Sequence, residues 1–130
     1  MTFGLVKISQ VRLNTFLSPF PSKGHLLNAD ECYLWIRNRK RLIGWTYNFN
    51  IHCPLIKCFT RLISCQGQPS STVRIANNTH IKCYIDKKSM LITSFNLTYP
   101  TVLDLGIVVS DIVLNNYMRR MFNKHWKALE

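Results

Sequence analysis

Acidic residues and long apolar runs are both scarce in this chain of 130 residues. Only 6 Asp and Glu stand against 17 Lys and Arg, which gives a formal net charge of +11. No stretch approaches the roughly 18 apolar residues of a membrane-spanning helix. Polar residues such as Lys7 and Arg12 interrupt the amino-terminal segment, which therefore lacks the apolar centre of a signal peptide. We expect a soluble, cytoplasmic protein without a membrane span.

The excess of positive charge is the first indication of function. A strongly positive surface attracts polyanions and accelerates their encounter with the protein. A nucleic acid fits this field, and so does an anionic membrane surface. A basic protein without a polyanionic partner is the remaining alternative.

The cysteines form an odd set without a CxxC pair, which argues against both a disulfide framework and a standard zinc site. We expect reduced, buried thiols and no metal or other cofactor. A zinc site made of His52, Cys53, Cys58 and Cys65 is the alternative, but its spacing matches no common pattern. The five cysteines are Cys32, Cys53, Cys58, Cys65 and Cys83.

The length and the hydrophobic content of 47% suit a single globular domain. Residues 1–31 are weakly patterned and are expected to be a lead-in to a domain over 32–130. Within it, strands are expected at 32–36, 42–48, 72–76, 80–85, 90–95 and 103–109, with helices at 54–65 and 112–129. The first two strands are expected to pair as a hairpin. This pattern predicts an α/β or α+β sandwich, in which helices flank a mixed sheet.

Two of the expected strands carry polar residues with a period of two. Alternation along the first places His80, Lys82 and Tyr84 on one face, with apolar residues behind them. On the next strand, Ser94 and Asn96 again share a face. Side by side, the strands would present an imidazole, an ammonium, a hydroxyl and a carboxamide to one pocket.

These groups suit attack on a phosphodiester. A neutral imidazole, that of His80, is a nucleophile, and Lys, Ser and Asn side chains donate hydrogen bonds to phosphoryl oxygens. Asp104 opens another expected strand and is expected to accept the far ring proton of His80, which would fix the tautomer. Such a reaction needs no metal.

The segment resembles the signature of the phospholipase D superfamily, HxKxxxxD followed by a Ser-x-Asn strand. His80, Lys82, Ser94 and Asn96 match its positions, and Asp86 is its acidic residue, although three residues rather than four separate it from Lys82. The resemblance covers roughly residues 40–130. It also includes an acidic residue that opens the last strand, Asp104, and a Phe-x-x-x-Trp closing helix at 121–126.

The resemblance implies a phospholipase D-like half-domain and a phosphohistidine intermediate on His80. Because two histidines are needed and the chain has one motif, it also implies a homodimer that pairs the two motifs across a two-fold axis. Short members with one motif are mostly nucleases. We therefore predict a metal-independent phosphodiesterase that hydrolyses DNA or RNA. The alternatives are a phospholipid-hydrolysing enzyme and a catalytically inactive nucleic-acid-binding scaffold.

Basic residues near the expected turns are candidates for contacts with the phosphate backbone. Four aromatic residues close to them either stack on unpaired bases or pack in the core; they are Trp35, Trp45, Tyr47 and Phe49. The basic candidates are Arg37, Arg39, Lys40, Arg41, Arg61, Arg74, Lys87 and Lys88.

Overall fold

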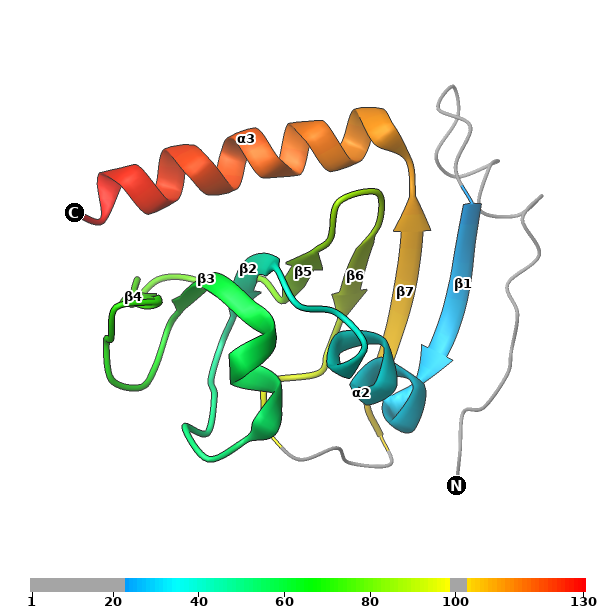
Figure 1. Ribbon diagram of the computed structural model, residues 1–130, viewed down its shortest axis with the longest axis horizontal. Helices are drawn as coiled ribbons and strands as arrows, with labels where there is room; N and C mark the ends of the chain where they lie inside the picture. Colours follow the sequence, from blue (N-terminus) through cyan, green and yellow to red (C-terminus); the bar gives the residue numbers. More distant parts are fainter. Residues whose placement is uncertain (1–22, 99–102) are drawn as a thin grey trace.

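A seven-stranded mixed sheet with helices on both faces forms the molecule (Figure 1), which confirms the predicted fold class. The computed structural model describes residues 23–98 and 103–130. Its elements are β1 (Lys23–Asn28), α2 (Ala29–Arg37), β2 (Leu42–Thr46), the short 3-10 helix η1 (Pro54–Cys58), β3 (Phe59–Ser64), β4 (Val73–Ile75), β5 (Cys83–Ile85), β6 (Met90–Thr93), β7 (Leu105–Ser110) and α3 (Ile112–Ala128).

The strand order across the sheet is β1-β7-β6-β5-β2-β3-β4. Neighbours in the series β2, β3 and β4 are parallel, whereas the remaining pairs are antiparallel. β5 therefore lies in the middle of the sheet, antiparallel to both β2 and β6. The two strands expected to carry the polar residues are indeed neighbours.

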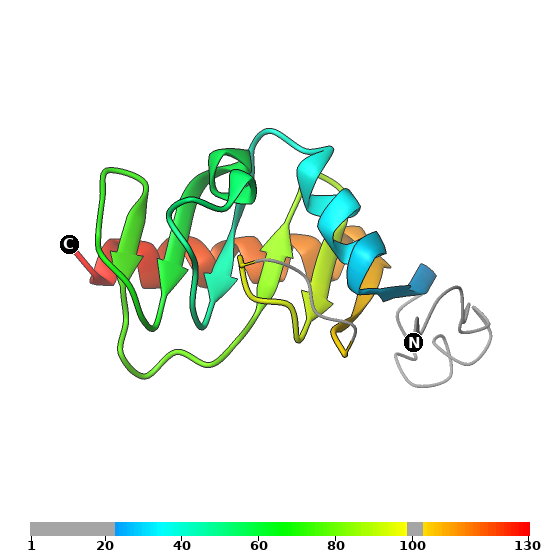
Figure 2. The same ribbon diagram turned by 90° about the horizontal axis from the view of Figure 1, so that it is seen from below.

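Apolar side chains from both faces of the sheet are buried, because α2 and η1 cover one face and α3 crosses the strands on the other (Figure 2). Along β2, Leu42 belongs to the core beneath α2 and η1, while Ile43 and Trp45 belong to the core beneath α3. A sheet covered on both sides gives strands that are apolar throughout. Accordingly, all five residues of β2 are buried.

α3 is held to the sheet mainly by Phe122, which is fully buried. Its ring packs edge-on against Trp45, with 5.2 Å between ring centroids, and stacks on Trp126 of the next helical turn. Asp111 caps the helix by accepting hydrogen bonds from the backbone N–H groups of Val113 and Leu114. The helix therefore begins directly after β7.

The strand expected at 32–36 is wrong, because these residues belong to α2. A capping box starts this helix: the Asn28 side chain accepts a hydrogen bond from the Glu31 N–H, and the Glu31 side chain accepts one from the Asn28 N–H. The expected hairpin with 42–48 is therefore absent. Cys32, Trp35 and Ile36 form the buried face of α2, a spacing of three and four that suits a helix.

The helix expected at 54–65 stops at Cys58, and the chain continues as β3. Burial on both faces explains the error, since an apolar segment in a covered strand has no period of two. β1 lies inside the expected lead-in, so the sheet starts at Lys23 rather than at residue 32. Residues 1–22 of that lead-in lie outside the described residues. Within the described part of the chain, neither helix has the length and apolarity that a bilayer crossing requires.

We predict that Phe122→Ala lowers the free energy of unfolding by about 3–5 kcal/mol, because it leaves a cavity between α3 and the sheet. Tyr117→Ala on the same helix is the matched control. Tyr117 is 52% exposed, so its loss should change stability by no more than about 0.5 kcal/mol. Urea unfolding followed by circular dichroism measures both, and similar losses in the two variants would contradict this account of the core.

Stability should fall as the pH rises above about 9. Burial raises the pKa of the Cys83 thiol from 9.0 to about 12, and it is also the main cause that raises the pKa of Cys32 to about 11. Between the unfolded and folded pKa values the native state binds more protons than the unfolded chain, so each step up in pH favours unfolding. Urea midpoints at about pH 8 and about pH 10 measure the effect. Cys83→Ala should reduce the fall, and an unchanged fall in that variant would count against a buried-thiol origin.

Candidate nucleic-acid interface

Two opposite edges of the sheet carry the polar residues. We call the edge where β2 begins and β5 ends the Arg41 edge, and the edge where β2 ends and β5 begins the Tyr47 edge. β5 rises about 3.3 Å per residue, so the residues before it and the residues after it are separated by the length of the strand. His80 and Lys82 precede β5, whereas Asp86 follows it.

At the Arg41 edge, a tight turn joins β5 to β6. The Asp86 N–H donates to the Ser89 carbonyl at 2.8 Å, which leaves Lys87 and Lys88 exposed at the tip. α3 fixes this turn through Asn115, which is fully buried and whose amide nitrogen donates to the carbonyls of Asp86 and Lys87 at 2.9 and 3.1 Å. The two lysines therefore project from a rigid backbone.

Arg39 is held in place by three contacts. Its Nε lies 3.0 Å from an Asp86 carboxylate oxygen, and its Nη1 donates to the Trp35 carbonyl at 2.6 Å. Its guanidinium carbon also lies 3.8 Å from the centroid of the Trp35 ring, a cation–π contact. On the other side of the turn, Arg119 of α3 donates to the Asp86 carbonyl at 2.8 Å.

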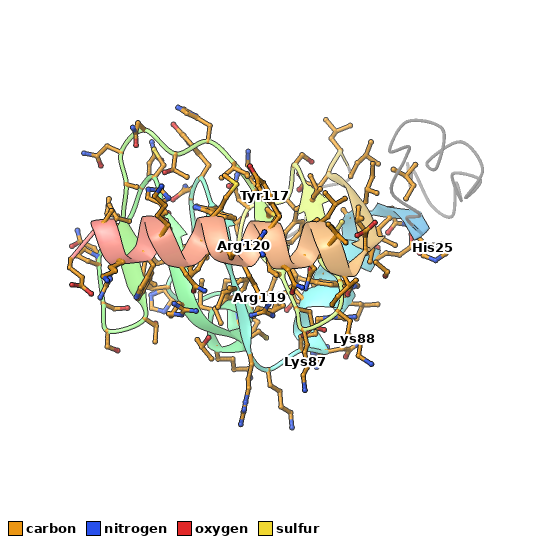
Figure 3. All side chains as sticks on the ribbon, turned by 90° about the horizontal axis from the view of Figure 1, so that it is seen from above. His25, Lys87, Lys88, Tyr117, Arg119 and Arg120 are labelled. Carbon is orange, nitrogen blue, oxygen red and sulfur yellow. The ribbon has the colours of Figure 1, made fainter. Side chains whose placement is uncertain are left out.

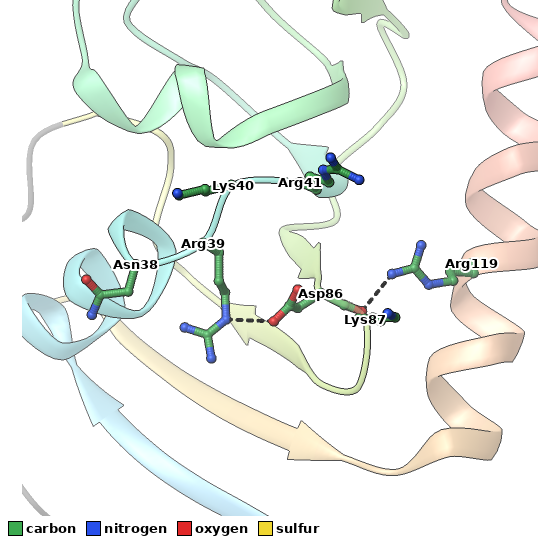
Figure 4. A pocket seen from close by; sticks show the side chains of 7 residues that line it. All are labelled: Asn38, Arg39, Lys40, Arg41, Asp86, Lys87 and Arg119. Atoms are coloured by element: carbon green, nitrogen blue, oxygen red, sulfur yellow. Dashed lines mark hydrogen bonds and ion pairs between the residues drawn. The ribbon is translucent and has the colours of Figure 1, made fainter.

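These residues surround a cavity of about 530 Å³, which we call the basic pocket (Figure 4). Its cations come from the loop before β2, from the β5–β6 turn and from α3. Asp86 is the one carboxylate among the lining residues, and it is already paired with Arg39. The pocket thus has a large excess of positive charge in a concave site. Its lining residues are Asn38, Arg39, Lys40, Arg41, Asp86, Lys87 and Arg119.

The other basic residues predicted to contact a backbone have different surroundings. Arg61 and Arg74 lie against α3, where the Arg74 guanidinium is 4.0 Å from the Trp126 ring centroid and that of Arg61 is 5.2 Å from the Phe122 ring centroid. Burial, and then the nearby Arg119 and Arg74, lower the pKa of Arg61. We assign these two residues to the packing of α3. Arg37, at the end of α2, is exposed.

At the Tyr47 edge, the structure brings His80 and Lys82 together around one aromatic ring. The exposed His80 ring stacks on Tyr47 with 5.3 Å between centroids, and the Lys82 Nζ lies 5.9 Å from the Tyr47 centroid. An accessible imidazole and an ammonium group therefore share a small surface.

The remaining residues predicted for catalysis are engaged by neighbouring groups. The Ser94 hydroxyl donates to the Asp104 carboxylate at 3.0 Å and accepts from the Leu105 N–H. The Asn96 amide oxygen accepts from the Asn48 N–H at 3.1 Å. The Asp104 carboxylate was expected to accept a proton from the His80 ring. It accepts the hydrogen bond of the Ser94 hydroxyl.

Two further expectations for this segment are corrected. Asp86 does not join His80, because the length of β5 places it at the Arg41 edge with Arg39. Tyr84 does not face the solvent: it is fully buried, its hydroxyl donates to Thr46 and to the Phe95 carbonyl, and burial raises its pKa. Tyr84 does face the side of the sheet opposite to Cys83 and Ile85, as predicted. That side is also covered by an apolar core, whereas it was expected to be polar.

Of the aromatic residues considered for stacking, Trp35, Trp45 and Phe49 are buried and belong to the core, which leaves Tyr47 at the surface. Sequence reasoning missed Arg119 and its neighbour Asn115, which reach the β5–β6 turn from the far end of the chain. Their spacing of four on an expected helix was a signal that both face the same way.

No family model matches the chain, and no curated protein matches it either. Among solved structures, the fold is similar to that of TrmBL2, described as an archaeal chromatin protein with a novel mode of DNA binding. The TM-score is 0.52 at 10% sequence identity, and the match covers 92% of this chain and 58% of TrmBL2. The likeness shows a common fold, and this chain spans less than two thirds of that protein.

These comparisons correct the resemblance to the phospholipase D superfamily. No family model supports it, and the fold is shared instead with a DNA-binding chromatin protein. A short motif made of common residue types has many false positives. Here the predicted residues divide between two edges of the sheet, with His80 at one and Asp86 at the other.

Proposed function

We propose that this chain binds DNA or RNA through the basic pocket. The observation that carries the proposal is the convergence of five cations, Arg39, Lys40, Arg41, Lys87 and Arg119, on a cavity with one carboxylate. Nucleic-acid phosphates are the polyanions that such a site recognises best, because arginine pairs with phosphate through two parallel hydrogen bonds.

Preorganisation and net charge both support this function. Arg39 and Arg119 are already fixed by protein contacts, so little side-chain entropy is lost when a phosphate arrives. The net charge of +11 adds long-range attraction. The DNA binding described for TrmBL2 agrees with the proposal.

We predict that Arg41→Ala/Lys87→Ala weakens binding to a labelled oligonucleotide and lowers the salt dependence. Each lost phosphate contact reduces the slope of log K against log salt by about 1, so the slope should fall by about 2. Fluorescence anisotropy over a salt series measures it. The matched control is Lys124→Ala/Lys127→Ala, which removes two exposed charges from the other end of α3. An equal loss in both variants would mean that only net charge matters and would refute a defined site.

A second candidate function is phosphodiester hydrolysis at the Tyr47 edge. It is supported by the exposed His80 imidazole next to the Lys82 ammonium group. In this reaction the imidazole attacks phosphorus, a P–N bond forms and the P–O bond to the leaving group breaks. The leaving oxygen takes a proton from a second histidine ring in its imidazolium form, supplied by another copy of the chain. Water then attacks phosphorus and gives its proton to that ring, now neutral, while a P–O bond forms and the P–N bond to His80 breaks.

If this reaction occurs, His80→Ala should abolish cleavage of a labelled oligonucleotide while the protein still binds it through the unchanged basic pocket. Cleavage by the unmodified protein should persist in EDTA, because the imidazole is the nucleophile. His52→Ala, at another exposed histidine, is the control and should cleave normally. Activity retained by His80→Ala, or lost on chelation, would remove this candidate and leave the binding function in place.

A further inference from the structure

A second cavity lies beside α3 at the Tyr47 edge, and we call it the aromatic pocket. Its volume is about 370 Å³, and it is lined by Trp45, Asn78, Thr79, His80, Ile81, Met121 and His125. Two large apolar side chains at its surface are accessible to a ligand, since Ile81 is 40% exposed and Met121 is 44% exposed. Exposed apolar groups around a concave site are typical of a ligand-binding surface.

The polar groups of this pocket suit a heterocyclic ring. The His125 Nδ1 accepts a hydrogen bond from the Trp45 indole N–H at 3.0 Å, so a neutral His125 carries its proton on Nε2 and can donate it. Tyr47 stacks on His80 and holds that ring in place. No carboxylate is present among the lining residues, so nothing in the pocket repels an anionic ligand. The pocket therefore combines the imidazole rings of His80 and His125, which can donate hydrogen bonds, with the apolar side chains of Ile81 and Met121.

Residues of α3 line both the basic pocket and the aromatic pocket. Asp86 and Lys87 of the basic pocket follow β5, while His80 and Ile81 of the aromatic pocket precede it. The two cavities therefore lie at opposite ends of one short strand, roughly 15 Å apart at about 3.3 Å per residue.

The helix surface between the two pockets is also basic. Arg119 lines the basic pocket and Met121 lines the aromatic pocket; two residues correspond to about 200° around a helix, so they lie on opposite flanks. Arg120 is exposed between them. Figure 3, which looks onto α3, shows Arg119 and Arg120 on the helix and Lys87 and Lys88 beside it. A polyanion that crosses α3 meets a cation midway.

We infer that the aromatic pocket binds an unpaired base of a single-stranded nucleic acid whose phosphates occupy the basic pocket. The inference rests on the proposed function and narrows its ligand from any nucleic acid to a single strand. A paired base has its ring faces and its pairing edge covered in the duplex, whereas a single strand can turn a base into a cavity. A cavity of about 370 Å³ lies at the small end of the range for small-molecule sites, which suits a single base. A stable protein partner would instead need a surface of about 800 Å² on each side.

The test compares two probes with two proteins. The probes are an oligothymidylate of about twelve nucleotides and a sugar-phosphate strand of the same length without bases, which differ only in the bases. The proteins are the unmodified chain and the double variant Ile81→Ala/Met121→Ala. Both substitutions of the variant are at exposed positions. Fluorescence anisotropy at one salt concentration gives the four affinities, and thermal unfolding verifies that the variant is folded.

The unmodified protein should bind the strand with bases roughly tenfold more tightly than the strand without them, as expected when one base buries part of its surface against the apolar side chains of the pocket. The variant should lose most of this preference and bind the base-free strand normally. Ile112→Ala/Val113→Ala, at two exposed positions on α3 outside the pocket, is the matched control and should keep the preference. A duplex should bind equally well to the unmodified protein and to the pocket variant.

Two results overturn the inference and identify which proposal failed. If the base preference is absent or survives in the pocket variant, while binding of the base-free strand still depends on Arg41 and Lys87, the base pocket is wrong and the proposed function stands. If the base-free strand does not bind, or binds independently of those two residues, both proposals fail.

Discussion

The packing of α3 across the sheet is the contact on which the remaining structure depends. The sheet has apolar side chains on both faces, so a single covering layer would leave one of them in water. Phe122 closes the second face by packing against Trp45 in the middle of the sheet. Because α3 runs across the strands rather than along them, this one helix covers strands that are distant in sequence and fixes their positions relative to each other.

The same crossing brings side chains of α3 to both edges of the sheet. Asn115 and Arg119 reach the β5–β6 turn on one flank, while Met121 and His125 reach the start of β5 on the other. Each pocket therefore combines residues from β5 or its neighbours with residues from the carboxyl-terminal helix. Any change in the position of α3 on the sheet would therefore alter both pockets together.

The sequence was sufficient for the class of fold and for the excess of positive charge, but not for the geometry of the candidate site. The expected ranges overlap the helix α3 and the four strands β4, β5, β6 and β7, because turn residues lie between these elements. Two of the misassigned segments, 32–36 and 59–65, are apolar in a way that fits either a strand or a helix. Alternation was expected to separate His80 from Ile81, yet both precede β5, are exposed and line one cavity. Tyr84 was expected on the polar face and is buried, since local spacing does not show that a second layer covers the sheet. The contact of Arg119 with the Asp86 carbonyl depends on tertiary structure and has no local signature.

The cations that line the basic pocket repel one another in the folded state. Folding concentrates Arg39, Lys40, Arg41, Lys87 and Arg119 around a cavity in which Asp86 neutralises one of them. Like charges held together destabilise the folded state, since the unfolded chain keeps them further apart. The protein still folds, because hydrophobic burial on both faces of the sheet contributes more to the free energy of folding than this repulsion costs. On the proposed function, a phosphate bound in the basic pocket would reduce this repulsion and would bind the folded state alone, so its binding free energy would also stabilise the fold. The proposal therefore accounts for a concentration of positive charge that the isolated fold does not need.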